Sequence, residues 1–77
     1  MDDQKIATVL LALAEARGAT RSFCPSEAAR RLSADWRPLM PNVRRVGAEV
    51  GLRATRKGID IDPLTARGPF RFSKPSP

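Results

Sequence analysis

The chain has 77 residues, of which 42% are hydrophobic and 29% are charged, and its formal net charge is +6 at pH 7. This composition is typical of one small folded domain with a single core, and it excludes a disordered chain. One cysteine and no histidine exclude an internal disulfide, a zinc framework and a histidine general base.

The net charge lies entirely in the second half of the chain. Residues 1–35 carry five basic and five acidic side chains, whereas residues 36–77 carry nine basic and three acidic ones. A field of one sign attracts polyanions and says little about fold. The asymmetry therefore indicates a polyanionic partner, with nucleic acid as the leading choice.

The first predicted helix runs from Asp3 to Arg17. Apolar residues recur at intervals of three and four positions between Ile6 and Leu13, as on one face of an α-helix. Gly18 follows the last periodic residue and suits the end of a helix. The apolar stretch is too short to span a bilayer and lacks the basic start of a secretory signal, so we expect a cytoplasmic protein without a membrane partner.

A short strand and a second helix are predicted next. Residues 20–23 alternate β-branched or aromatic side chains with polar ones, which is typical of a strand. Pro25 suits the first turn of a helix, where its missing N–H is not needed, and the helix is predicted over residues 25–32. We expect Cys24 to be a small buried residue rather than a reactive thiol, because the chain has no histidine to activate it.

The third helix is predicted from Pro41 to Val50, and Gly51 is its natural stop. The opposite side of its helical wheel from the apolar stripe carries Arg37 and Arg44, with Arg45 at the edge. The stripe itself covers about one third of the wheel and is expected in the core. Its members are Trp36, Leu39, Val43, Val46 and Val50.

Residues 52–62 predict a β-hairpin around a turn that contains glycine. Arg56 and Lys57 are expected at its tip, which is either a wing that touches an anion or an ordinary charged turn. Asp60 and Asp62 are expected to face outward and to pair with cations such as Arg53. The expected buried face consists of Leu52, Ala54, Ile59 and Ile61.

The end of the chain predicts one more extended piece over residues 68–72, with Phe70 and Phe72 turned inward. Arg67 and Arg71 flank it and either bind an anion or pair with the hairpin aspartates. We expect a single domain over residues 1–72 and a flexible tail over residues 73–77.

Together these elements predict a mainly α domain with a small antiparallel β-sheet. Their order is helix, short strand, helix, helix and β-hairpin, which is the order of a winged helix-turn-helix. In such a fold the third helix is narrow enough for the major groove of DNA, while the hairpin reaches along the phosphate backbone.

Several blocks of the sequence resemble a small bacterial family of unknown function, DUF3253. The resemblance covers the chain from Cys24 to Arg71 and implies a bacterial protein with a winged-helix-like fold, but no activity. The blocks are CPSEAAR from Cys24, WRPLMP from Trp36 with Val43 and Arg44, TRKG from Thr55, and Arg67-Gly68-Pro69 with Arg71.

The function expected from these features is binding of nucleic acid, with duplex DNA ahead of RNA. The expected contact residues are Arg37, Arg44 and Arg45 on the third helix and Arg53, Arg56 and Lys57 on the hairpin. The alternative is a protein-interaction module that forms a homodimer or takes an acidic protein partner. We expect no enzymatic activity and no cofactor, because no catalytic spacing is present.

Overall fold

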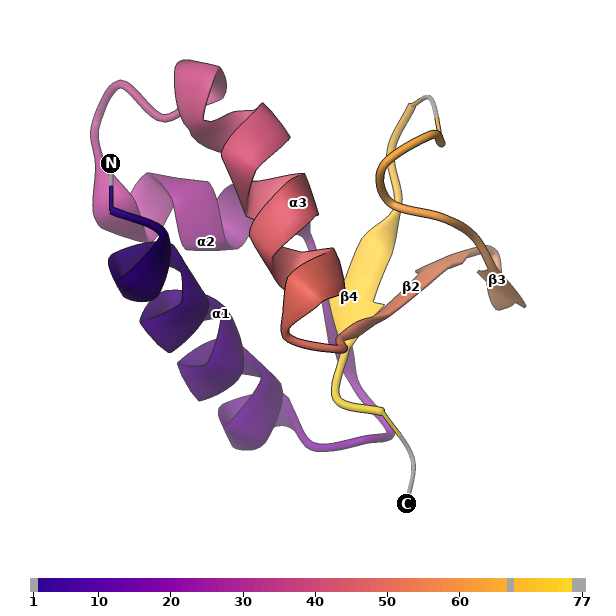
Figure 1. Ribbon diagram of the computed structural model, residues 1–77. Helices are drawn as coiled ribbons and strands as arrows, with labels where there is room; N and C mark the ends of the chain where they lie inside the picture. The colour runs from indigo at the N-terminus through magenta and orange to yellow at the C-terminus, as the bar shows by residue number, and fades with distance from the viewer. Residues whose placement is uncertain (1, 67, 76–77) are drawn as a thin grey trace.

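Three helices and a small sheet make up the computed structural model, which describes residues 2–66 and 68–75 (Figure 1). The elements are α1 (Asp3–Arg17), β1 (Ser22–Phe23), α2 (Pro25–Leu32), the 3₁₀-helix η1 (Arg37–Leu39), α3 (Met40–Glu49), β2 (Arg53–Arg56), β3 (Ile59–Asp60) and β4 (Arg71–Ser73). The predicted class, mainly α with a small antiparallel sheet, is confirmed, and the elements follow one another in the expected order.

The helix boundaries follow from local chemistry. The Asp2 carboxylate accepts a hydrogen bond from the backbone N–H of Gln4 at 2.9 Å and so caps α1, while Gly18 ends it with a φ of 74° that suits glycine. Both α1 and α2 have the predicted bounds. The third helix spans Met40–Glu49 rather than Pro41 to Val50. It begins earlier because η1 runs directly into it and leaves Pro41 in the first turn, and it ends with Val50 as its C-cap.

The sheet has the strand order β1-β4-β2-β3, with every pair antiparallel. The last strand of the chain therefore lies between two earlier ones, where Phe72 pairs with Phe23 on one side and with Ala54 on the other. Figure 1 shows the three helices on one side of this sheet. No helix of the described residues covers the opposite face.

The core lies between the helices and the inner face of the sheet. Phe72 is fully buried at its centre and meets Phe70 edge-on, with ring centroids 5.1 Å apart. This confirms that both phenylalanines turn inward. Trp36 and Leu39 are partly buried and pack against the same core, as their place on the apolar stripe predicted.

The hairpin differs from prediction on its outer strand. Leu52 and Ala54 are buried as expected, but Ile61 is half-buried and Ile59 is 70% exposed. The expected inward placement of Ile59 was wrong, because β3 is an edge strand and lies away from the helices in Figure 1. A side chain on the correct face of a strand is buried only where something packs against it.

Two further expectations concern the sheet and the tail. The first strand is shorter than the predicted residues 20–23, and β4 extends one residue beyond Phe72, so that Ser73 pairs with Ser22 and Arg53. Lys74 forms an ion pair with Glu15 at 2.8 Å. Residues 76 and 77 of the expected tail lie outside the described part of the chain.

Candidate nucleic-acid interface

Arg45 lies on α3, where its guanidinium group pairs with two carboxylates. Its Nη2 donates to both carboxylate oxygens of Asp3 on α1, at 2.8 and 2.9 Å, and its Nη1 donates to Oε1 of Glu49 at 3.0 Å. The hydrogen bonds with Asp3, followed by those with Glu49, raise the pKa of Arg45 above its ordinary value. Arg45 therefore stays charged and joins α3 to α1, while its positive charge is offset locally.

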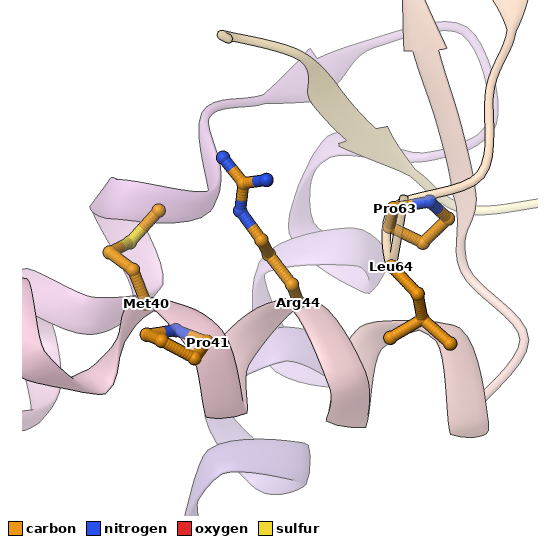
Figure 2. A pocket seen from close by; sticks show the side chains of 5 residues that line it. All are labelled: Met40, Pro41, Arg44, Pro63 and Leu64. Carbon is orange, nitrogen blue, oxygen red and sulfur yellow. The ribbon is translucent and has the colours of Figure 1, made fainter. Parts of the chain in front are cut away.

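Arg44, one residue earlier, points away from α1 toward the connection between β2 and β4. Its Nη1 donates to the backbone carbonyl oxygen of Ala66 at 3.0 Å, and its guanidinium carbon lies 5.0 Å from the centroid of the Phe70 ring. Figure 2 shows Arg44 between Met40 on one side and Pro63 with Leu64 on the other. The side chain therefore links α3 to the segment that leads into β4.

These same residues, together with Pro41, line an open hollow of about 400 Å³. Leu64 contributes an apolar side chain that is 61% exposed. The segment around it is a turn in which the Asp62 carboxylate accepts a hydrogen bond from the Leu64 backbone N–H at 2.9 Å. Asp62 thus stabilises a turn, and with the described residues it forms no ion pair across the hairpin, contrary to expectation.

Arg37 lies on η1, just before α3, with its guanidinium carbon 4.8 Å from the centroid of the Trp36 ring. Arg30 of α2 lies at the same distance from that ring. The half-buried indole therefore makes cation–π contacts with two guanidinium groups, and these contacts place two positive charges near the amino-terminal end of α3. Arg30 was not among the expected contact residues, because nothing in the sequence pattern places α2 beside Trp36.

The hairpin places its three expected cations differently. Arg53 donates from Nε to the Asp60 carboxylate at 2.6 Å, which confirms the predicted cross-strand pair. Arg56 donates from Nε to the carbonyl oxygen of Pro69 at 2.9 Å. Lys57 lies in the two-residue turn with a φ of 52° and is exposed, and its side chain forms no ion pair or hydrogen bond with the described residues.

Two of the expected contact residues, Arg44 and Arg56, bind the same segment of the chain, which precedes β4. Arg44 of α3 and Arg56 of β2 both donate to backbone carbonyl groups within residues 66–70. They attach the connection between β2 and β4 to the rest of the domain from two sides. Arg45 and Arg53 are directed elsewhere, each toward a carboxylate.

Three further residues were singled out in the sequence: Arg71, Arg67 and Cys24. Arg71 donates from Nε to the Ser22 hydroxyl oxygen at 2.6 Å and from Nη2 to the Ser22 carbonyl oxygen at 3.0 Å, so it pairs with neither hairpin aspartate. Arg67 lies outside the described residues. Cys24, expected to be buried, is half-buried, with its Sγ 3.0 Å from the Ser26 hydroxyl oxygen.

Two other features bear on function: groups of metal ligands and helices that could span a membrane. Among residues 2–66 and 68–75, no three histidine, cysteine or acidic side chains gather as metal ligands would. Within the same ranges, no helix has the length and hydropathy needed to cross a membrane. The described surface also carries guanidinium and ammonium groups, such as those of Arg37 and Lys57, which can bind anions.

A comparison with models of protein families gives a match. The family model described as "Protein of unknown function (DUF3253)" matches residues 3–75, which is nearly the whole chain. A search of the curated proteins found no match.

Proposed function

The chain belongs to the DUF3253 family of proteins of unknown function, and from its geometry we propose that it is a winged-helix module that binds duplex DNA. The order of its elements is that of a winged helix-turn-helix. The whole net charge of +6 comes from the half that holds α3 and the hairpin. A DNA-binding role of this kind belongs in the cytoplasm of a bacterium, which is the source that the family resemblance implies.

The observation that carries the proposal is the attachment of the connection between β2 and β4 to α3. Arg44 and Arg56 hold this connection, and the turn at Lys57 begins it. A basic turn at the far end of the hairpin can follow the phosphate backbone while α3 enters the major groove. Duplex RNA fits less well, because its major groove is too narrow and deep for side chains to read.

The contact residues of this proposal are Arg37, Arg44, Arg56 and Lys57. No carboxylate among the described residues offsets the charge of Arg37, Arg44 or Lys57, and Arg56 directly precedes Lys57 at the end of β2. Arg44 has five N–H donors and uses one for Ala66, so others are available to a phosphate. Arg45 and Arg53 contribute less, because each faces a carboxylate that repels DNA.

The test is a titration of a labelled, mixed-sequence duplex followed by fluorescence anisotropy at low and moderate salt. The matched variants are Lys57→Gln and Lys5→Gln, since both lysines are exposed and form no ion pair or hydrogen bond with the described residues. We expect Lys57→Gln to weaken binding several-fold and to reduce the salt slope by about one, while Lys5→Gln changes neither. No binding at low salt, or equal effects of the two variants, overturns the proposal.

A second function is favoured by the exposed apolar side chain of Leu64 beside Met40 and Pro41. This patch would suit self-association or a partner protein, and it adjoins the exposed side of α3. Light scattering over a range of concentrations separates the two functions. A dimer that Leu64→Ser dissociates would favour the protein-interaction role, because the same contact would cover the helix offered to DNA.

A further inference from the structure

The face of the sheet that points away from the helices carries a row of polar side chains. Ser73 of β4 pairs with Ser22 of β1 on one side and with Arg53 of β2 on the other. Paired residues of antiparallel strands present their side chains on the same face. Because the neighbouring row, Ala54, Phe72 and Phe23, is buried in the core, the serines and Arg53 face outward.

The first turn of chain after α1 encloses this row and forms a small hollow. Its volume is about 160 Å³, which is below the roughly 300 Å³ at which pockets for drug-sized molecules begin. We call it the outer-sheet hollow; its lining residues are Ala19, Thr20, Arg21, Ser22, Arg53, Thr55, Gly58 and Ser73. It can hold a small polar group but not a large substrate.

Several polar side chains that line this hollow have hydrogen-bond donors or acceptors without a partner among the described residues. Ser73 is only 7% exposed although it lies on the outward face, and its hydroxyl forms no hydrogen bond with the described residues. Among the described residues, every side-chain nitrogen or oxygen that is fully enclosed has a hydrogen-bond partner. Because the Ser73 hydroxyl has none, it is not fully enclosed, and the side that it exposes lines the hollow. The Thr55 hydroxyl and the Arg21 guanidinium group, which also line it, have no partner among the described residues.

The charge around the hollow selects the kind of ligand. Arg21 and Arg53 line it, and Asp60 beside them is occupied by the Nε of Arg53. The other guanidinium nitrogens of Arg53 form no hydrogen bond with the described residues. Two guanidinium groups with several hydroxyl donors match a tetrahedral oxyanion, which accepts many hydrogen bonds and carries negative charge.

We infer that the outer-sheet hollow is a binding site for a phosphate group, held by Arg21 and Arg53 and by the hydroxyls of Thr55 and Ser73. The phosphate belongs either to a free phosphorylated compound or to the backbone of a nucleic acid, since Gly58 lines the hollow directly beside Lys57. The site lies on the face opposite the helices, and its binding of free phosphate does not depend on the DNA-binding role.

The experiment is an NMR titration of the ¹⁵N-labelled chain with inorganic phosphate at constant ionic strength, with chloride as the reference anion. We expect saturable shifts of the Ser22, Thr55 and Ser73 amides in phosphate and none in chloride. The isosteric variant Thr55→Val and the variant Ser73→Ala should each weaken phosphate binding about fivefold or more, because each removes a hydrogen bond to a charged group. Asp60→Asn should strengthen it, because a competing carboxylate for Arg53 is lost.

A second arm titrates a short DNA duplex and identifies the source of the phosphate. Shifts at the same amides assign the site to the nucleic-acid backbone, whereas their absence assigns it to a free phosphorylated compound. Lys5→Gln serves as the control for loss of one positive charge away from the hollow. Phosphate shifts that do not saturate, or that Thr55→Val and Ser73→Ala leave unchanged, overturn the site whether or not the duplex binds.

Discussion

At residue 47 the backbone of α3 lies so close to the sheet that only glycine fits. A Cβ atom built on Gly47 would lie 2.3 Å from Cζ and 2.7 Å from Cε2 of Phe72, a ring that is fully buried. The backbone of Gly47 is helical, so the requirement is for space rather than for an unusual φ. The pattern of apolar residues could not reveal it, because it depends on which ring faces the helix.

We therefore expect Gly47→Ala to destabilise the chain, although alanine favours helix by about 1 kcal/mol over glycine. Overpacking against Phe72 should outweigh this and cost a net ~1–3 kcal/mol, which lowers Tm by several degrees in so small a domain. Thermal and denaturant unfolding followed by circular dichroism measures both quantities. The double variant Gly47→Ala/Phe72→Leu should lose less than the sum of the two single losses. A gain in stability for Gly47→Ala alone contradicts this explanation.

Among the elements, the helices were predicted closely and the sheet less so. Apolar periodicity and the residues at the ends mark α1 and α2, and both have the expected bounds. The hairpin was placed correctly in sequence, but the exposure of Ile59 depends on how far the helices extend over the sheet. Likewise, periodicity placed Arg44 and Arg45 on α3 without showing that one contacts Ala66 and the other contacts Asp3.

The connection between β2 and β4 is attached to α3 by the side chain of Arg44. Arg44→Met keeps much of the length of the side chain but removes the hydrogen bond to Ala66 and the cation–π contact with Phe70. We expect a loss of roughly 1–2 kcal/mol of stability. Amide hydrogen exchange at Thr65 and Ala66, whose N–H groups donate to the Asp62 carbonyl oxygen, should become faster.

The same variant separates two roles of Arg44. If it weakens DNA binding together with faster exchange, Arg44 acts by positioning the connection. Weaker DNA binding with unchanged exchange would instead mean that Arg44 contacts the phosphate directly. Unchanged exchange and unchanged unfolding together would contradict the attachment described here.

For the whole molecule, ion pairs decide how much of the +6 charge acts on a partner. If the four contact residues neutralise about four phosphates, the logarithm of the association constant should fall with the logarithm of salt concentration with a slope of about −3 to −4. Anisotropy titrations at several salt concentrations give this slope. A value near zero would contradict electrostatic binding, whereas a much steeper slope would mean that Arg45 and Arg53 also leave their carboxylates for DNA.

Binding and stability should not depend on pH near neutrality. The chain has no histidine, and the raised pKa of Arg45 means that its guanidinium group is fully charged at neutral pH and loses its contribution to stability only as pH rises through the raised value. We therefore expect the same Tm and DNA affinity at about pH 6 and about pH 7.5. A clear change in either quantity over this interval would reveal a titrating group that the described contacts do not account for.

The sequence by itself determined the helices, the order of the elements and the uneven charge, because these depend on neighbouring residues and on composition. The tertiary structure decided which cations are offset and which are available. Arg45 and Asp3, for example, form an ion pair although they are 42 positions apart in the chain. It also decided that Ser22, Ser73 and Arg53 share one row on the outer sheet. Contacts between distant residues form only when packing brings the elements together, so no local pattern records them.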